Sequence, residues 1–183
     1  MKTIKLTAKD FDSNNQYKGD IDFSNYYDND FNVEIEANLG WVSFLALRVK
    51  GYIQALTGTG IKAGEGIEAG WGIEAGEGIE AGTGIKAGWG IKAGEGIEAG
   101  EGIEAGLSIK CKAKLSFKYR LFAGTATFRD MGCEEKEIEC GKLEGGTVCY
   151  GTVKELGLPE EKDDVTQEAI KLLKSKGFKI VKG

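Results

Sequence analysis

The chain has 183 residues, a formal net charge of −5, 29 glycines and one proline. So much glycine with so little proline excludes a collagen-like chain and a proline-rich linker. The sequence has no histidine, so the commonest general base, metal ligand and physiological pH switch is missing. We therefore expect no catalytic residue, no metal site and no cofactor. The mild acidity gives no reason to expect general affinity for nucleic acids.

The N-terminal segment contains no apolar run of signal-peptide length, and no stretch of the chain approaches 18 consecutive apolar residues. We therefore expect a cytoplasmic protein without membrane association. Residues 1–30 are rich in turn-forming Asp, Asn and Gly and are predicted to form an N-terminal cap. Cysteines in a chain without a secretion signal are expected to be free, buried thiols. They are Cys111, Cys133, Cys140 and Cys149.

From residue 31 the chain alternates between apolar and other residues, as in FNVEIEANLGWVSFLALRVKGYIQAL. This alternation is typical of strands with one buried face. Many of its apolar residues also fit the 18-residue spacing of the repeat that follows it. We therefore predict a single β-solenoid over residues 31–123, with its regular part at residues 58–110.

Isoleucine recurs nine times at every sixth position from Ile61 to Ile109, and through Ile103 it stands in the unit Gly-Ile-(Lys/Glu)-Ala-Gly-X. Six is not a helical period, and glycine at one position in three would weaken a helix. Six is three times the strand period, so Ile and Ala point to one face and the charged residue between them to the other. The repeat predicts a parallel β-solenoid with stacked isoleucines and bends at the glycines.

Two coil sizes compete. Trp71, Trp89 and Leu107 recur at a spacing of 18, and Ile53 precedes Trp71 by the same step, which favours three hexads per coil and a triangular prism. The Lys/Glu position favours a flattened coil of two hexads, because six of seven pairs have opposite sign at a spacing of 12 and four of six at 18. We predict the triangular form and keep the flattened coil as its rival.

After Cys111 the chain continues as alternating strands, and its last part changes to a helical pattern with an N-cap at Asp164 and a stop at Gly177. The apolar face of this predicted helix comprises Val165, Ala169, Leu172 and Leu173. We therefore predict a β-rich segment and one α-helix in residues 124–183, which cap the open end of the solenoid.

Hexads with an aliphatic residue at every sixth position resemble the hexapeptide repeats of left-handed β-helix proteins over residues 58–110. The resemblance implies a left-handed triangular β-helix in which three hexads, a period of 18, make one coil. The sequence departs from the usual pattern, in which the small inward residue precedes the aliphatic one by two places, because Ala follows Ile here. Hexapeptide-repeat acyltransferases use a histidine base, so a chain without histidine is not expected to be one.

Three groups of side chains are candidates for contacts with a partner. Trp71 and Trp89 take the position X that elsewhere holds Glu or Thr, so we expect them on the surface as an aromatic ladder. Regularly placed repeat carboxylates can imitate the phosphates of DNA or face a basic protein groove. These carboxylates are Glu65, Glu77, Glu95 and Glu101. The third group is a basic strand whose charged side chains are expected to lie on one solvent-exposed side: Lys112, Lys114, Lys118 and Arg120. Plain core packing for the tryptophans and solvated faces for the charges are the alternatives.

These features favour a non-enzymatic protein that binds and inhibits a protein or a protein–nucleic-acid complex. The repeat style of GIKAGEGIEAGWGIEAG is similar to that of uncharacterised proteins of phages and mobile elements, among which anti-CRISPR and other anti-defence proteins occur. This resemblance implies inhibition of a nucleic-acid-processing complex inside a bacterial host cell. A structural or scaffolding rod is the alternative. Direct nucleic-acid binding is not favoured, and association of two rods stays open.

Overall fold

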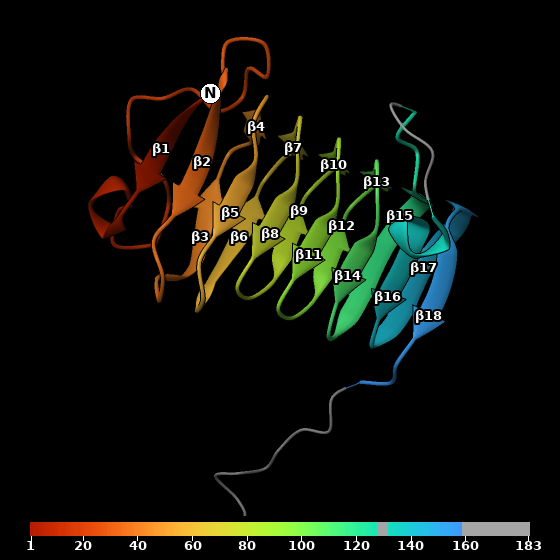
Figure 1. Cartoon of the computed structure of the whole chain (residues 1–183). Helices are drawn as coiled ribbons and strands as arrows, with labels where there is room; N and C mark the ends of the chain where they lie inside the picture. The colour runs from red at the N-terminus through yellow and green to blue at the C-terminus, as the bar shows by residue number, and fades with distance from the viewer. Residues whose placement is uncertain (128–131, 159–183) are drawn as a thin grey trace, which may run out of the picture.

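Each hexad of the repeat forms one short strand, Ile-(Lys/Glu)-Ala, and the glycine-containing triplet after it turns the chain toward the next face. The chain thereby winds as a parallel β-solenoid of about six turns (Figure 1). The computed structural model describes residues 1–127 and 132–158. The predicted helix between Asp164 and Gly177 lies outside the described residues.

Three faces result. The first face consists of β1 (Lys2–Leu6), β2 (Phe31–Ile35), β5 (Ile53–Ala55), β8 (Ile73–Ala75), β11 (Ile91–Ala93), β14 (Ile109–Cys111), β16 (Glu137–Cys140) and β18 (Thr152–Glu155). The second face consists of β3 (Gly40–Phe44), β6 (Thr59–Ala63), β9 (Ile79–Ala81), β12 (Ile97–Ala99) and the first half of β15 (Lys114–Ala123). The third face consists of β4 (Leu47–Val49), β7 (Ile67–Ala69), β10 (Ile85–Ala87), β13 (Ile103–Ala105) and the second half of β15.

Strand β15 turns a corner of the prism, because its first half pairs with β12 and its second half with β13. β17 (Lys142–Tyr150) follows β15 around the same corner in parallel. Two short 3-10 helices, η1 (Ala8–Asp10) and η2 (Cys133–Lys136), lie outside the regular coils. No helix in residues 1–127 and 132–158 is long and apolar enough to cross a membrane.

The strand register confirms a coil of about 18 residues. Ile79 of β9 lies opposite Ile61 on one side and Ile97 on the other, and the same step relates the other two faces. At the corner, the Trp89 N–H donates to the Trp71 carbonyl at 3.0 Å, so these two residues are stacked neighbours. The flattened coil of two hexads is therefore wrong. The left-handed sense of the coil stays a prediction.

The regular grid fails in the N-terminal coils. Ile53 lies opposite Ile73 and is not stacked on Trp71. The residue one coil before Trp71 is Gly51, whose carbonyl oxygen accepts a hydrogen bond from the Trp71 N–H. The reason is the corner after β5, which is longer than a regular corner and includes Gly58 at a φ of +75°. This corner makes the step between paired residues 19 from Val42 to Ile61 and 20 from Ile53 to Ile73, against 18 in the regular coils. The step from Lys2 of β1 to Phe31 of β2 is 29, because residues 7–30 lie between these strands.

The nine isoleucines of the repeat form the buried spine that the sequence predicts. None is more than 1% exposed, and the inward residue two places after each one, alanine in eight hexads and Cys111 in the ninth, is also buried. Burying an isoleucine side chain stabilises the fold by about 2–3 kcal/mol, so this spine is the main source of stability. At the N-terminal end, Phe11, Tyr17 and Phe23 pack around Phe44 of β3 with ring centroids 5.4–5.8 Å from it.

The cysteines differ in their surroundings. Cys111 and Cys140 are free and take the inward alanine position in adjacent coils, whereas Cys149 is free but exposed. The expectation of a buried thiol is therefore wrong for Cys149, which lies in the outermost strand, β17. Burial, with a smaller contribution from Cys140, raises the pKa of the Cys111 thiol from 9.0 to about 12.

This shift makes a pH-dependent contribution to stability. The unfolded thiol ionises near pH 9 and the folded one near pH 12, so Cys111 favours the unfolded state increasingly as pH rises between these values. We expect Cys111→Ala, which restores the residue of the regular repeat, to gain about 1 kcal/mol per pH unit relative to the wild type in this window. Urea unfolding of both proteins at pH 8, 10 and 11 measures the difference. A difference that does not change with pH would contradict a buried thiol.

Candidate interaction surface

Every face of the solenoid carries a shallow trough that follows from the hexad. Ile and Ala point inward and the charged residue between them points outward, so the glycine ahead of each Ile is the other outward position and has no side chain. In stacked coils these glycines leave a groove between the charged row and the corner residues at position X. Cavities of about 460, 650 and 420 Å³ lie in the troughs of the first, second and third faces.

Three carboxylates, Glu80, Glu95 and Glu98, line the trough of the second face, and Glu77 lies one coil below Glu95 at the corner. We call these four residues the acidic block. Glu95 stacks on Glu77 at the corner, where its N–H donates to the Glu77 carbonyl at 3.1 Å. Glu98 lies directly opposite Glu80 in the pairing of β12 with β9. Neighbouring strands are about 4.8 Å apart, so both pairs place like charges at a separation that destabilises a sheet.

The charge of the acidic block is only partly compensated. Lys62 lies one coil below Glu80 and pairs with it at 2.8 Å. The hydrogen bond to Glu80 raises the pKa of Lys62, and the charge of Glu98 adds to the shift. In the described part of the chain, Glu77, Glu95 and Glu98 have no ion pair within 4.0 Å. Within the described residues, one carboxylate of the block is therefore ion-paired and three are not.

Different side chains close the two ends of this trough. At the N-terminal end, the indole of Trp41 lies over Gly60 and Gly78: a Cβ on these glycines would come within 2.9 Å and 2.6 Å of the ring. At the C-terminal end, Lys112 stacks on Glu95 through a 3.0 Å backbone hydrogen bond. Lys114 lies in the same trough and pairs with Glu144 at 3.4 Å. The second face thus combines an aromatic ring, four carboxylates and two lysines.

The first face differs in its chemistry. Its trough is bordered by Trp71 and Trp89, whose rings stack with centroids 5.7 Å apart and an angle of 9°. The two side chains are 43% and 49% exposed, so the predicted surface ladder is confirmed. The charged row of this face pairs internally: Glu74 with Lys92 at 2.8 Å, and Lys110 with Glu137 at 3.5 Å.

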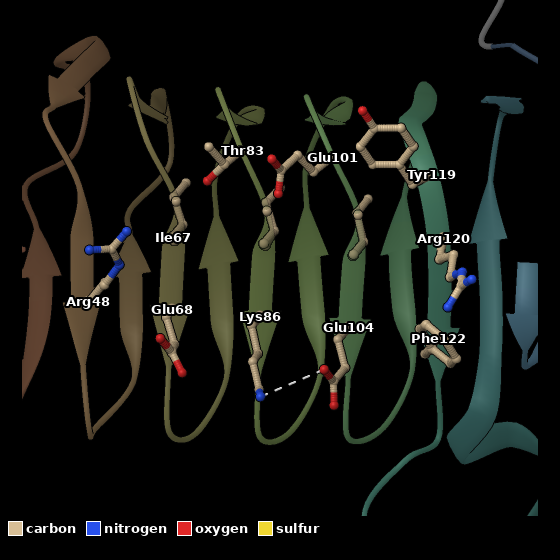
Figure 2. A pocket seen from close by; sticks show the side chains of 15 residues that line it. Arg48, Ile67, Glu68, Thr83, Lys86, Glu101, Glu104, Tyr119, Arg120 and Phe122 are labelled. Carbon is tan, nitrogen blue, oxygen red and sulfur yellow. Dashed lines mark ion pairs between the residues drawn. The ribbon is translucent and has the colours of Figure 1, made fainter. Parts of the chain in front are cut away.

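The third face carries charges of both signs that also pair with one another. Figure 2 shows its trough, with Lys86 joined to Glu104 at 3.7 Å and Arg120 at the C-terminal end. At the N-terminal end, Arg48 pairs with Glu65 at 3.2 Å. Because these pairs neutralise much of the face, the third face lacks the concentrated charge of the acidic block.

The structure divides the residues selected from the sequence among several places. Glu95, Lys112 and Lys114 line the trough of the second face, with Glu77 one coil below Glu95 at its corner. Trp71 and Trp89 lie on the opposite edge of the prism, between the third and first faces. Glu65, Glu101 and Lys118 stack along the edge between the second and third faces. Arg120 belongs to the third face, so the expectation that the basic strand shares one side is wrong: β15 turns the corner.

Sequence reasoning missed Trp41, Glu80 and Glu98. The signal for the two glutamates is present, because they form one of the two like-charge pairs at a spacing of 18, but it can be read only once the coil size is known. Trp41 lies in an irregular coil and pairs with Gly60, 19 residues later, whereas paired residues of the regular coils are 18 apart. The regular spacing therefore does not place Trp41 over Gly60.

In the part of the chain that the structure describes, no group of three or more Asp, Glu or Cys side chains is placed to hold a metal ion. No protein-family model, curated protein or solved structure matches the chain.

Proposed function

We propose that the chain is a non-enzymatic binding protein that inhibits a nucleic-acid-processing complex by laying its second face on a basic surface of that complex. The observation that carries the proposal is the acidic block. It stacks Glu80 on Glu98 and Glu77 on Glu95, although opposite charges at these positions would favour the fold. A basic partner surface would turn this unfavourable arrangement into an attraction.

The spacing of the block supports mimicry of nucleic acid. Its four carboxylates lie in two columns over two adjacent coils with a rise of about 4.8 Å, which gives one carboxylate per roughly 2.4 Å of the solenoid axis within the block, before the pairing of Glu80 with Lys62 is counted. Duplex DNA carries one charge per about 1.7 Å of its axis. A stacked solenoid also holds these groups at fixed separations, so little conformational entropy is lost on binding. We further propose that the protein acts against a defence system of a bacterial host. We also propose that its coil is left-handed, as in hexapeptide-repeat proteins.

Two matched variants test the proposal. The first replaces the acidic block by glutamine at all four positions, and the control makes the same change outside the block, at Glu68, Glu74, Glu101 and Glu104. Both variants lose the same net charge. The assay measures binding of target DNA to each of a panel of purified bacterial RNA-guided nucleases, with and without the protein.

We expect the wild type to reduce DNA binding by at least one nuclease of the panel, and to do so less at high salt. The acidic-block variant should need at least about 100-fold more protein for the same effect, and the control less than about fivefold more. If both variants lose the same amount of inhibition, the inhibition depends on net charge and not on the acidic block. No inhibition of any nuclease by the wild type would contradict the proposed function.

A further inference from the structure

Trp41 presents one face of its indole to solvent at the end of the acidic trough. The ring lies along the solenoid axis, because one side of it sits above Gly60 of β6 and the other above Gly78, one coil further on. Both positions lack a side chain, so the ring rests on the backbone of two coils. The side chain is still 37% exposed, which leaves its outer face open.

The groups beside this ring are carboxylates. Glu80, Glu95 and Glu98 line the same cavity of about 650 Å³ as Trp41. Among residues 1–127 and 132–158, the cation–π contacts are those of Lys118 with Tyr119 and of Lys136 with Tyr150, so no cation of this part of the chain covers the ring of Trp41. In the described part of the chain, the exposed indole face therefore lies beside Glu95 and Glu98, which have no ion pair there.

We infer that this site receives an arginine side chain of the protein partner. A guanidinium group can stack flat on an indole and at the same time donate two parallel hydrogen bonds to a carboxylate, here Glu80 or Glu98. A lysine ammonium gains the charge attraction but not the planar stacking or the paired hydrogen bonds. Nucleic acid is disfavoured, because its phosphates would meet the acidic block.

This inference rests on the proposed function, since it names the partner group that the second face recognises. It also assigns a role to Gly60 and Gly78, which precede Ile61 and Ile79: they leave room for the indole of Trp41. A methyl group at Gly78 would come within 2.6 Å of the indole and lift it from the trough. Trp41 and the two glycines thus form one receptor surface, to which the acidic block adds charge.

Binding of nona-arginine and nona-lysine peptides, measured by isothermal titration calorimetry, tests the inference. We expect the wild type to bind nona-arginine about fivefold more tightly than nona-lysine. Trp41→Ala should remove this preference by weakening nona-arginine binding alone. Trp89→Ala, on the opposite edge of the prism, should leave both affinities unchanged.

A second measurement avoids dependence on a truncated side chain. The chain has three tryptophans, so Trp71→Phe combined with Trp89→Phe leaves Trp41 as the only indole. Nona-arginine should then quench or shift its fluorescence, and nona-lysine should do so much less. Equal affinities in the wild type, or a preference that survives Trp41→Ala, would overturn the arginine site while leaving the acidic face in place. If neither peptide binds, the second face is wrong as a contact surface for basic groups, and the proposed function fails with it.

Discussion

Gly88→Ala is expected to destabilise the protein by about 3 kcal/mol or more, although it adds one methyl group to a residue between two strands. The glycine after each alanine passes closest to the coil below it. A Cβ at Gly88 would overlap the carbonyl oxygen of Gly70, one coil earlier, and the same overlap recurs for the glycines of the following corners. The new Cβ, fixed to the backbone of Gly88, would collide with the backbone of Gly70, so no side-chain movement can relieve the overlap.

The control for this prediction is Gly90→Ala. Gly90 belongs to the other glycine column, ahead of an isoleucine, where a Cβ would lie 3.1 Å from the carbonyl oxygen of Ser108. Ser108 itself occupies that column one coil later, so the column tolerates a side chain. We expect a change below about 1 kcal/mol. Urea unfolding followed by circular dichroism compares the variants, and equal midpoints would show that the two glycine columns are equivalent.

Ile85→Ala should cost about 3 kcal/mol. Ile85 is 1% exposed and lies in register between Ile67 of β7 and Ile103 of β13. Removing three carbon atoms in the middle of the stack leaves a cavity that the coils above and below cannot fill, because their backbones are fixed by strand pairing.

Lys86→Ala tests the same strand on its outer side. Lys86 pairs with Glu104 at 3.7 Å, and both side chains are about half exposed, so the loss should stay within about 0.5 kcal/mol. If the two substitutions lower the urea midpoint by the same amount, the isoleucines do not form the stabilising spine of the solenoid.

The repeat allowed prediction of the strands, of the buried isoleucines and of the exposed tryptophan ladder, because a period of six leaves little choice of which side chains share a face. The charge pattern at a spacing of 12 pointed to the wrong coil. Surface ion pairs contribute only about 0–1 kcal/mol, so pairs such as Lys62 with Glu80 add little compared with isoleucine stacking and close glycine packing.

The N-terminal coils could not be placed from the sequence, because their corners vary in length. The longer corner after β5 shifts every earlier residue against the regular grid. The same shift concealed Trp41, whose position over Gly60 depends on a step one position longer than the regular coil. A candidate site that combines the regular and the irregular coils therefore appears only in the folded chain.

The inhibition assay with the two matched glutamine variants tests most directly whether the second face is the contact surface. We expect that neutralising Glu77, Glu80, Glu95 and Glu98 abolishes the competition with DNA, while neutralising the four control glutamates preserves it. A protein that still inhibits fully without the acidic block would show that its partner is held elsewhere on the solenoid.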